Sequence, residues 1–92
     1  MTANGESAPE PQLIPLNAIF ADDFVELLIP VMSNNTMTEV AAAVAHHAEG
    51  VRVRPRDARK RVYHDNRVLP DDMTVAEAGI APLDHIRVDY DD

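Results

Sequence analysis

Residues 36–50 constrain the fold more than any other segment, because they predict an amphipathic helix with a capping signal at each end. Thr36 and Glu39 have the spacing of a capping box, in which each side chain bonds the backbone N–H of the other residue. Gly50 stands where a left-handed residue commonly ends a helix. Residues at helical spacing form one apolar stripe: Met37, Val40, Ala41, Val44, Ala45 and Ala48. A helix must bury such a stripe. Because no second helix of similar length is predicted, we expect it to pack on a sheet.

The remaining apolar runs supply the strands of that sheet. In chain order, the sequence predicts strands over residues 13–20 and 24–32, the helix over 36–50, a connection over 51–58, strands over 59–63 and 67–69, a short helix over 74–79 and a strand over 85–90. A hairpin, a helix across one sheet face and a final returning strand are the elements of a ubiquitin-like β-grasp. We therefore expect an α+β fold, with a mixed four- to five-stranded sheet packed against one main helix plus a short second helix.

The length of 92 residues supports one domain. Residues 1–12 hold glycine, serine, glutamate and proline with almost no large apolar residue, so we expect a flexible tail at 1–12 and the β-grasp domain at 13–92. No run approaches the roughly 18 apolar residues of a membrane span. The first residues also lack the basic and apolar regions of a signal peptide. We therefore expect a cytoplasmic protein with no membrane partner.

The charge is distributed unevenly along the chain. Residues 51–67 hold seven cations and two acids, a net +5, which leaves −13 for the rest of a chain whose total is −8. The cations are Arg52, Arg54, Arg56, Arg59, Lys60, Arg61 and Arg67. The acidic total argues against nucleic acid as the main partner. The basic segment predicts a cationic patch beside the C-terminal end of the main helix, suited to an acidic protein partner. A solvated surface of mixed charge would give the same sequence pattern.

Candidates for catalysis and metal binding are few. The chain has no cysteine, which excludes disulfides, thiolate zinc sites and iron–sulfur ligation, and it lacks the Glu-x-x-His motif of diiron bundles. His46, His47 and Glu49 are close in sequence, but adjacent helical side chains point about 100° apart, so both histidines cannot face one metal. We expect no catalytic, cofactor-binding or metal-binding residue in this chain. His47, beside the apolar stripe, is expected to be a contact or partly buried residue.

Several motifs occur together in a specific order and spacing. They are Phe20-x-x-Asp23-Phe24, Met37-x-x-Val40-Ala41-x-x-Val44-Ala45-x-His47, Arg52-Val53-x-Pro55, Arg61-Val62, Leu69-Pro70-x-Asp72-Met73-Thr74-x-Ala76-Glu77-x-Gly79-x-x-Pro82 and Ile86-x-Val88. In this combination the sequence resembles the gamma (B) subunit of the toluene, phenol and alkene monooxygenase hydroxylases, from about Asn17 to Asp92. It departs from that pattern in its longer N-terminal segment, in the His46-His47 pair and in the Asp91-Asp92 ending.

The resemblance implies an accessory, ubiquitin-like subunit without catalytic residues, in a hydroxylase of paired alpha, beta and gamma chains. It implies a diiron centre in the alpha subunit, and an effector protein, a Rieske ferredoxin and a reductase in the wider system. We predict a non-catalytic structural subunit that packs on the alpha chain. Two other interpretations stay open: a free-standing ubiquitin-like adaptor for another acidic protein and, third, an unrelated small enzyme. The candidate interface residues are Arg52, Arg54, Arg56, Arg59, Arg61 and His47.

Overall fold

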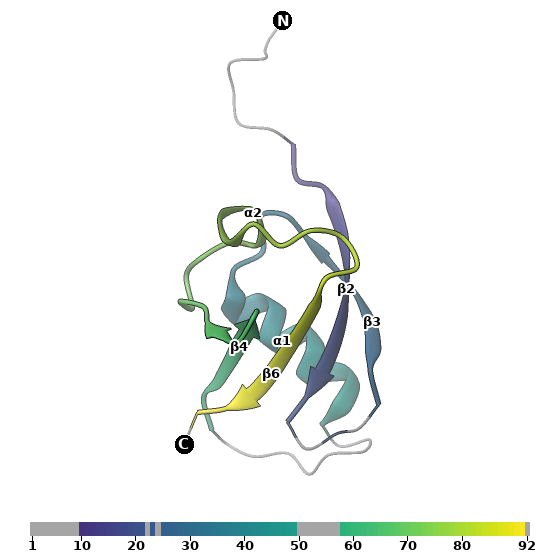
Figure 1. Ribbon diagram of the computed structural model, residues 1–92, viewed down its shortest axis with the longest axis vertical. Coiled ribbons are helices and arrows are strands. Elements are labelled where there is room, and N and C mark those ends of the chain that lie inside the picture. The colour runs from purple at the N-terminus through teal and green to yellow at the C-terminus, as the bar shows by residue number, and fades with distance from the viewer. Residues whose placement is uncertain (1–9, 22, 24, 50–57, 92) are drawn as a thin grey trace, which may run out of the picture.

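In the computed structural model, which describes residues 10–21, 23, 25–49 and 58–91, the chain forms a five-stranded sheet with one long helix across one face (Figure 1). The elements are β2 (Leu13–Phe20), β3 (Leu27–Met32), α1 (Met37–Ala48), β4 (Lys60–His64), β5 (Arg67–Val68), α2 (Val75–Ala78) and β6 (His85–Tyr90). Each predicted helix and strand is present within the described ranges. The predicted connection over 51–58 lies outside them, apart from Ala58.

The sheet has the strand order β3-β2-β6-β4-β5. β2 runs parallel to β6, whereas the β2–β3, β4–β6 and β4–β5 pairs are antiparallel. The last strand of the chain therefore lies in the centre, between the first hairpin and β4. This is the mixed β-grasp sheet that the order of the predicted elements indicated.

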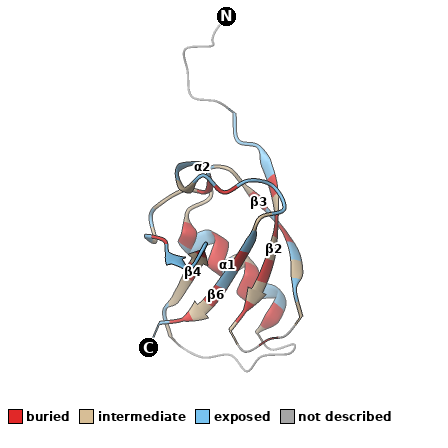
Figure 2. Ribbon diagram, in the orientation of Figure 1, coloured by how far each residue is buried: buried red, intermediate tan, exposed pale blue. Residues whose placement is uncertain are grey.

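The core lies between the sheet and α1, because alternate strand residues point to the same face. In β2 the buried side chains are Ile14, Leu16, Ala18 and Phe20, and in β6 they are Ile86, Val88 and Tyr90. All six members of the predicted stripe of α1 are buried against them, as Figure 2 shows in red. At one end of the core the rings of Phe20 and Tyr90 meet edge to face, with centroids 5.3 Å apart.

Both capping boxes form as predicted. The Thr36 N–H donates to Oε1 of Glu39 (2.9 Å), and the Glu39 N–H donates back to Oγ1 of Thr36 (3.3 Å). Thr74 and Glu77 make the same pair of bonds before α2, which ends at Gly79 in the left-handed region (φ 73°). Gly50, the predicted end of α1, lies outside the described residues.

The N-termini of the two helices bond to each other, which the sequence did not reveal. The Met37 N–H at the start of α1 donates to the carbonyl of Met73 (2.9 Å), and the Val75 N–H at the start of α2 donates to the carbonyl of Asn35 (2.9 Å). The first N–H groups of a helix have no partner within it, so each helix here supplies acceptors for the other. The α2 segment is thereby held against the start of α1.

Three strands have boundaries that differ from the prediction. β4 covers Lys60–His64 rather than 59–63, so His64 belongs to the strand and not to the predicted turn. The second strand begins at Leu27 rather than at residue 24, because Asp23 is buried and its Oδ1 accepts the N–H of Val25 (3.2 Å), which forms a local turn before the ladder begins. β5 ends at Val68 rather than Leu69. The Leu69 side chain is buried in the core, and the following proline cannot continue the ladder.

Candidate protein-interaction surfaces

The candidate interface residues divide between two parts of the molecule. Arg52, Arg54 and Arg56 lie outside the described residues. Arg59 and Arg61 lie at the start of β4 and along it, and His47 lies in the last turn of α1. The structure therefore brings Arg59 and Arg61 together at Asp91 and places His47 on a different element.

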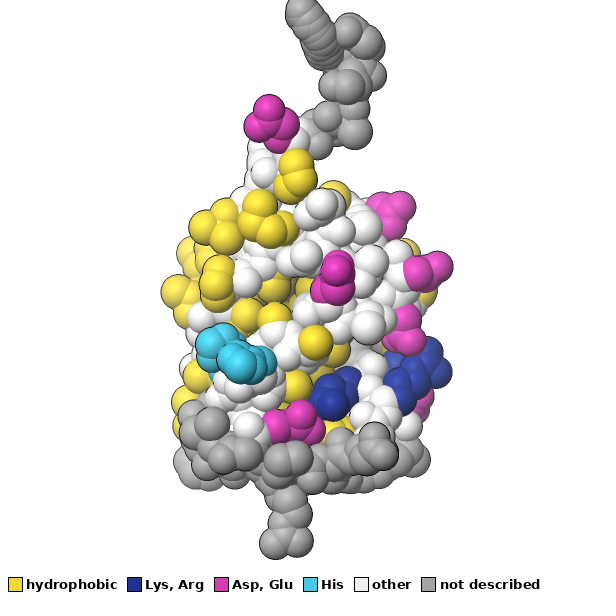
Figure 3. Space-filling view, turned by 180° about the vertical axis from the view of Figure 1, so that it is seen from behind, with side chains coloured by type: hydrophobic (Ala, Val, Ile, Leu, Met, Phe, Trp, Pro, Cys, Tyr) yellow, Lys and Arg dark blue, Asp and Glu magenta, His cyan; other side chains and the backbone are white. Residues whose placement is uncertain are grey.

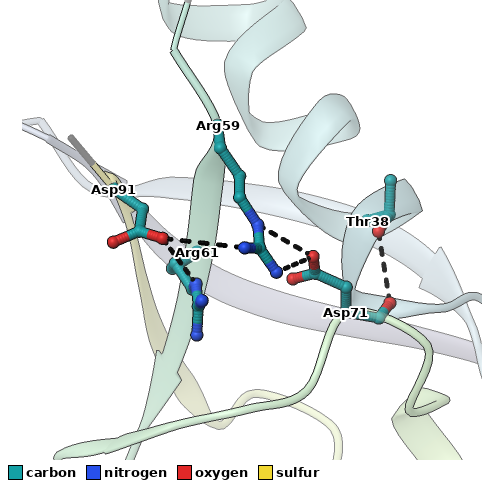
Figure 4. A network of polar contacts seen from close by, with 5 residues as sticks. All are labelled: Thr38, Arg59, Arg61, Asp71 and Asp91. Atoms are coloured by element: carbon teal, nitrogen blue, oxygen red, sulfur yellow. Dashed lines mark hydrogen bonds and ion pairs between the residues drawn. The ribbon is translucent and has the colours of Figure 1, made fainter.

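Arg59 and Arg61 belong to one network of ion pairs (Figure 4). Nε of Arg59 donates to Oδ2 of Asp71 (3.0 Å), Nη2 of Arg59 also contacts that oxygen, and its Nη1 lies 3.9 Å from Oδ2 of Asp91. Nε of Arg61 donates to the same Asp91 oxygen (3.0 Å). The carbonyl of Asp71 in turn accepts the N–H (3.1 Å) and the hydroxyl (3.2 Å) of Thr38. The network thus joins β4 to the first turn of α1 and to the residue after β6.

A second group joins β4 and β6 to the other end of α1. Nζ of Lys60 lies 3.6 Å from Oε2 of Glu49, and the Tyr90 hydroxyl donates to that carboxylate oxygen (2.5 Å). The Lys60 ammonium also lies 5.6 Å from the centroid of the Tyr90 ring. Of the three consecutive cations, only Lys60 therefore reaches the C-terminal end of α1, where the sequence analysis expected the whole patch. Arg59 reaches the N-terminal end instead.

Between α1 and the start of β4 lies an open groove of about 290 Å³. Its floor is made of small side chains, Ala41, Ala42 and Ala58, and its rim carries Arg59 and Asp71. Because each described cation here has a carboxylate within ion-pair distance, the rim is a surface of mixed charge. Such a surface can contact a protein partner through exchangeable ion pairs at its periphery.

His47 is exposed, so it is not the partly buried residue that the sequence analysis allowed, and its role as a contact residue stays a prediction. At about 100° per residue, its direction falls just outside the stripe, next to that of Val40. In the last turn Ala45 and Ala48 face the sheet instead. The His47 ring meets that of His46 edge to face at 5.2 Å.

A buried histidine that the sequence analysis left without a partner ties β4 to the turn before β6. Nε2 of His64 lies 3.1 Å from Oδ2 of Asp84, and that oxygen also accepts the N–H of Ala81 (3.0 Å). The Ala81 bond and, second, the His64 bond lower the pKa of Asp84 below its usual value of 3.8. Within the described residues Nδ1 of His64 has no hydrogen-bond partner, and it lies 3.8 Å from Oδ2 of Asp65. The alternation of Val62 and His64 in β4 was the one sequence signal for this burial.

Among the described residues no group of three or more histidine, aspartate or glutamate side chains is arranged to hold a metal ion. No helix in the same ranges has the length and apolar character to cross a membrane.

The chain matches the family model of toluene-4-monooxygenase system protein B (TmoB) over residues 13–90. It belongs to this family. It is 38% identical over 80 residues to the gamma subunit of the toluene-4-monooxygenase hydroxylase component of Ectopseudomonas mendocina, a match that covers 85% of this chain and 95% of the relative. The prediction of a monooxygenase gamma subunit is thereby confirmed.

Solved structures agree with this assignment. A chain in a toluene 4-monooxygenase complex with the inhibitor 4-bromobenzoate superposes with a TM-score of 0.84 at 36% identity, over 87% of this chain and all of that one. The ubiquitin of Caldiarchaeum subterraneum has a TM-score of 0.70 at 21% identity, over 88% of this chain and 96% of that one. The ubiquitin-like domain of Plasmodium falciparum Dsk2 has a TM-score of 0.68 at 16% identity, over 87% of this chain and 100% of that one. The last two confirm the ubiquitin-like fold alone.

The longest motif of the sequence analysis, residues 69–82, lies where the two helix N-termini meet. Leu69 anchors it in the core, and the carbonyl of Met73 accepts the first N–H of α1. Thr74 and Glu77 cap α2, and Gly79 ends it with a positive φ. These residue types therefore serve the fold, because they hold α2 against α1.

Proposed function

We propose that this TmoB-family chain is the non-catalytic gamma subunit of a soluble diiron monooxygenase hydroxylase and packs on the alpha subunit. The observation that carries the proposal is the 38% identity to a hydroxylase gamma subunit over 95% of that subunit's length. The same ubiquitin-like domain in a toluene 4-monooxygenase complex, with a TM-score of 0.84, supports it. The role is mechanical: this domain contributes surface and rigidity to the assembled hydroxylase.

In this role the diiron centre would lie in the alpha subunit, and this chain would supply no ligand to it. The partners would be the alpha and beta subunits in a paired alpha–beta–gamma assembly, and the wider system would include an effector protein, a Rieske ferredoxin and a reductase. The assembly would act in the cytoplasm on aromatic or alkene substrates. The family resemblance of this chain supports these assignments. The relative is named for toluene, which supports an aromatic substrate.

The basic side of β4 is a candidate part of the interface with the alpha subunit. Arg59 is half exposed (54% of its side chain) and could exchange its contacts with Asp71 and Asp91 for a carboxylate of the partner. Arginine is over-represented in interfaces, because its planar guanidinium can bond two oxygens at once. Arg61 lies beside it, and we retain Arg52, Arg54, Arg56 and His47 as further candidates.

Co-expression with the alpha and beta subunits tests the proposal. Affinity purification through a tag on the alpha subunit is expected to retain this chain at one copy per alpha chain. The hydroxylase prepared without it is expected to be less stable on heating. The isolated chain, after chelation and dialysis, is expected to hold no stoichiometric iron. Iron that survives this treatment, or a chain that does not co-purify, would contradict the proposed role.

A further inference from the structure

The sheet face turned away from α1, here called the open face, is unusually apolar. Alternation in β2 points Leu13 to this face, and the pairing of Leu28 with Asn17 and of Val68 with Tyr63 places Leu28 and Val68 on it as well. Leu13 and Leu28 are 61% and 62% exposed. A sheet face in contact with water is ordinarily polar.

The fourth large exposed hydrophobic residue of the described ranges borders the same face. Leu83 is 59% exposed, and its N–H donates to the carbonyl of Pro15 (2.6 Å), which lies in β2 between Leu13 and Asn17. All four such residues therefore lie on or beside the open face. Val68 is on the edge strand β5, separated from Leu13 and Leu28 by β6 and β4, so the apolar part of the face lies over β2 and β3. Exposed apolar surface on a sheet face marks an interaction site.

The opposite side of the molecule differs. The exposed positions of α1 are Thr38, Glu39, Ala42, His46 and His47, which are polar or small. In Figure 3, which views this side, the histidines lie over α1 and the Lys and Arg side chains over β4, while hydrophobic atoms gather toward β3. Hydrophobic side chains are therefore also exposed on this side of the molecule, mainly toward β3.

At the centre of the open face an arginine is stacked on a tyrosine. The guanidinium of Arg87 lies 4.2 Å from the centroid of the Tyr63 ring, and its Nη1 donates to Asp89 (2.6 Å). Within the described residues its other nitrogens make no hydrogen bond. Together with Ile19, His85 and two acidic residues, Glu26 and Asp65, this stack lines a shallow hollow of about 330 Å³. Arginine and tyrosine are the residue types that most often dominate binding energy at interfaces.

We propose that the open face is the surface that docks on the alpha subunit, and that the alpha subunit presents there an apolar patch and a carboxylate directed at Arg87. This inference rests on the proposed function. The apolar patch would lie over the β2–β3 hairpin around Leu28. The carboxylate would bond the free nitrogens of the Arg87 guanidinium, which the Tyr63 ring and Asp89 already hold in position.

The charge of the whole chain favours a different protein over a second copy. Two copies docked face to face would bring together two chains that each carry a net charge of −8. The open face itself is of mixed charge: Arg61, Arg87 and Asp89 lie on it, and Glu26 and Asp65 line the hollow beside Arg87. A carboxylate of the alpha subunit would therefore be complementary to Arg87 in particular, and not to the face as a whole.

The edge of β3 favours docking on the face over the addition of a strand. Pro30 lies within β3 and pairs with Pro15 of β2. A proline in an edge strand has no N–H to donate, so it interrupts the row of groups that another strand would pair with. The contact is therefore made by side chains of the open face.

A competition experiment tests the apolar part of the proposal. Complexes of tagged alpha and beta subunits with fluorescently labelled wild-type chain are challenged with unlabelled variants. Leu28→Glu is expected to compete at least about 30-fold more weakly than wild type, as for a central interface residue. His46→Glu, which adds the same charge at an exposed position on α1, is the control and is expected to compete normally. If the melting temperature of Leu28→Glu is more than a few degrees below that of wild type, Leu13→Glu serves as the second variant.

The charge of Arg87 is tested by the salt dependence of the same competition. Arg87→Gln is expected to weaken binding about tenfold at low salt and to reduce its salt dependence, because a desolvated ion pair is lost. Arg67→Gln is the matched control, since Arg67 is exposed on β5 and pairs with His64, whose side chain points to the α1 side of the sheet. Equal effects of the two substitutions would overturn the assignment of a carboxylate opposite Arg87.

The possible failures are distinguishable. If folded Leu28→Glu and Leu13→Glu compete like wild type while wild type binds, the open face is not the docking surface and the proposed function stands. If wild type is not retained by the alpha and beta subunits, both proposals fail. If the free chain sediments as a dimer that Leu28→Glu dissociates, a second copy covers the face and the inference is overturned.

Discussion

Single residues at the ends of α1 and of β6 hold the sheet and the helices in register. Asp84 accepts two hydrogen bonds through one carboxylate oxygen, and the Tyr90 hydroxyl bonds Glu49 across the sequence. The His64 and Glu49 partners lie 20 and 41 residues away in the chain, whereas the Ala81 bond to Asp84 is local. Loss of one partner leaves the other group without its bond, so these positions are sensitive to small chemical changes.

Asp84 is expected to give the fold an acid-sensitive contribution. Because the Ala81 and His64 bonds lower the pKa of Asp84 in the folded chain, its contribution to stability is present above its ordinary pKa of 3.8 and is lost as the pH falls through the lowered value. In urea unfolding between pH 6 and pH 2, Asp84→Asn is expected to remove this part of the acid dependence. Asp72→Asn, at an exposed position in a turn, is the control. Parallel pH profiles for wild type and Asp84→Asn would contradict the assignment.

Tyr90→Phe is expected to destabilise the fold by about 1.5–3 kcal/mol, as for a bond to a charged acceptor. The hydroxyl is the only group removed, and the Tyr90 side chain is buried, so the Glu49 carboxylate loses a donor that water replaces poorly. Tyr63→Phe is the matched control, because Tyr63 lies on the open face. Urea unfolding of both variants is the measurement, and equal losses would show that the Glu49 contact contributes little.

At the scale of elements, the two helices form one unit through their N-termini. Each N-terminus has its own capping box, and each also donates backbone N–H groups to carbonyls that precede the other helix. The short α2 is too small to be stable alone, since an isolated helix of one turn does not recover the cost of nucleation. Its four residues are helical because α1 and the core hold them.

The two caps are therefore expected to be coupled. Thr36→Ala and Thr74→Ala should each cost about 1 kcal/mol. The double variant is expected to lose less than their sum by at least ~0.5 kcal/mol, because fraying of one N-terminus already removes acceptors from the other. Urea unfolding of the four proteins gives this coupling. Thr36→Ala combined with Tyr90→Phe, at the other end of α1, should be additive; strict additivity of the two cap variants would show that the helices are independent.

At the scale of the whole molecule, the two candidate interface surfaces differ in character. Arg59 pairs with Asp71 beside α1, whereas the large exposed hydrophobic residues lie on the open face or border it, together with Arg61 and Arg87. Exposed apolar surface of this kind marks an interaction site. The apolar side chains of the open face are the property of the molecule that fits the proposed role in a hydroxylase.

The start of the folded unit is tested by two truncations. Composition predicts that removal of residues 1–9 leaves the melting temperature unchanged. Removal of 1–12 also deletes Gln12, whose N–H donates to Oγ of Ser33 (2.9 Å) and whose carbonyl accepts the Ser33 N–H (2.8 Å). Loss of these bonds at about 1 kcal/mol or less each should lower the melting temperature by several degrees. A lower melting temperature for the chain that lacks only residues 1–9 would show that these first residues belong to the fold.

The local elements were determined by the sequence itself. Strand alternation predicted β2 over Leu13–Phe20 and β6 over His85–Tyr90, and two capping boxes predicted the starts of α1 and α2. These signals succeed because the interacting groups lie within one helical turn or follow the period-two alternation of a strand. The order of the elements then sufficed for the β-grasp fold. Arg59 and Arg61 were chosen as interface candidates from charge alone, and their role at an interface stays a prediction.

Only the tertiary structure decided which distant groups meet. His64 and Asp84 lie 20 residues apart, and Asn17 reaches the carbonyl of Leu83 across 66 residues. The sequence marks such residues as polar but not as partners, since any of 16 acids could have paired with a given cation. The apolar open face was hidden for the same reason. Its leucines are separated along the chain and become one surface only when strand pairing sets the register, because a shift by one residue would turn each of them into the core.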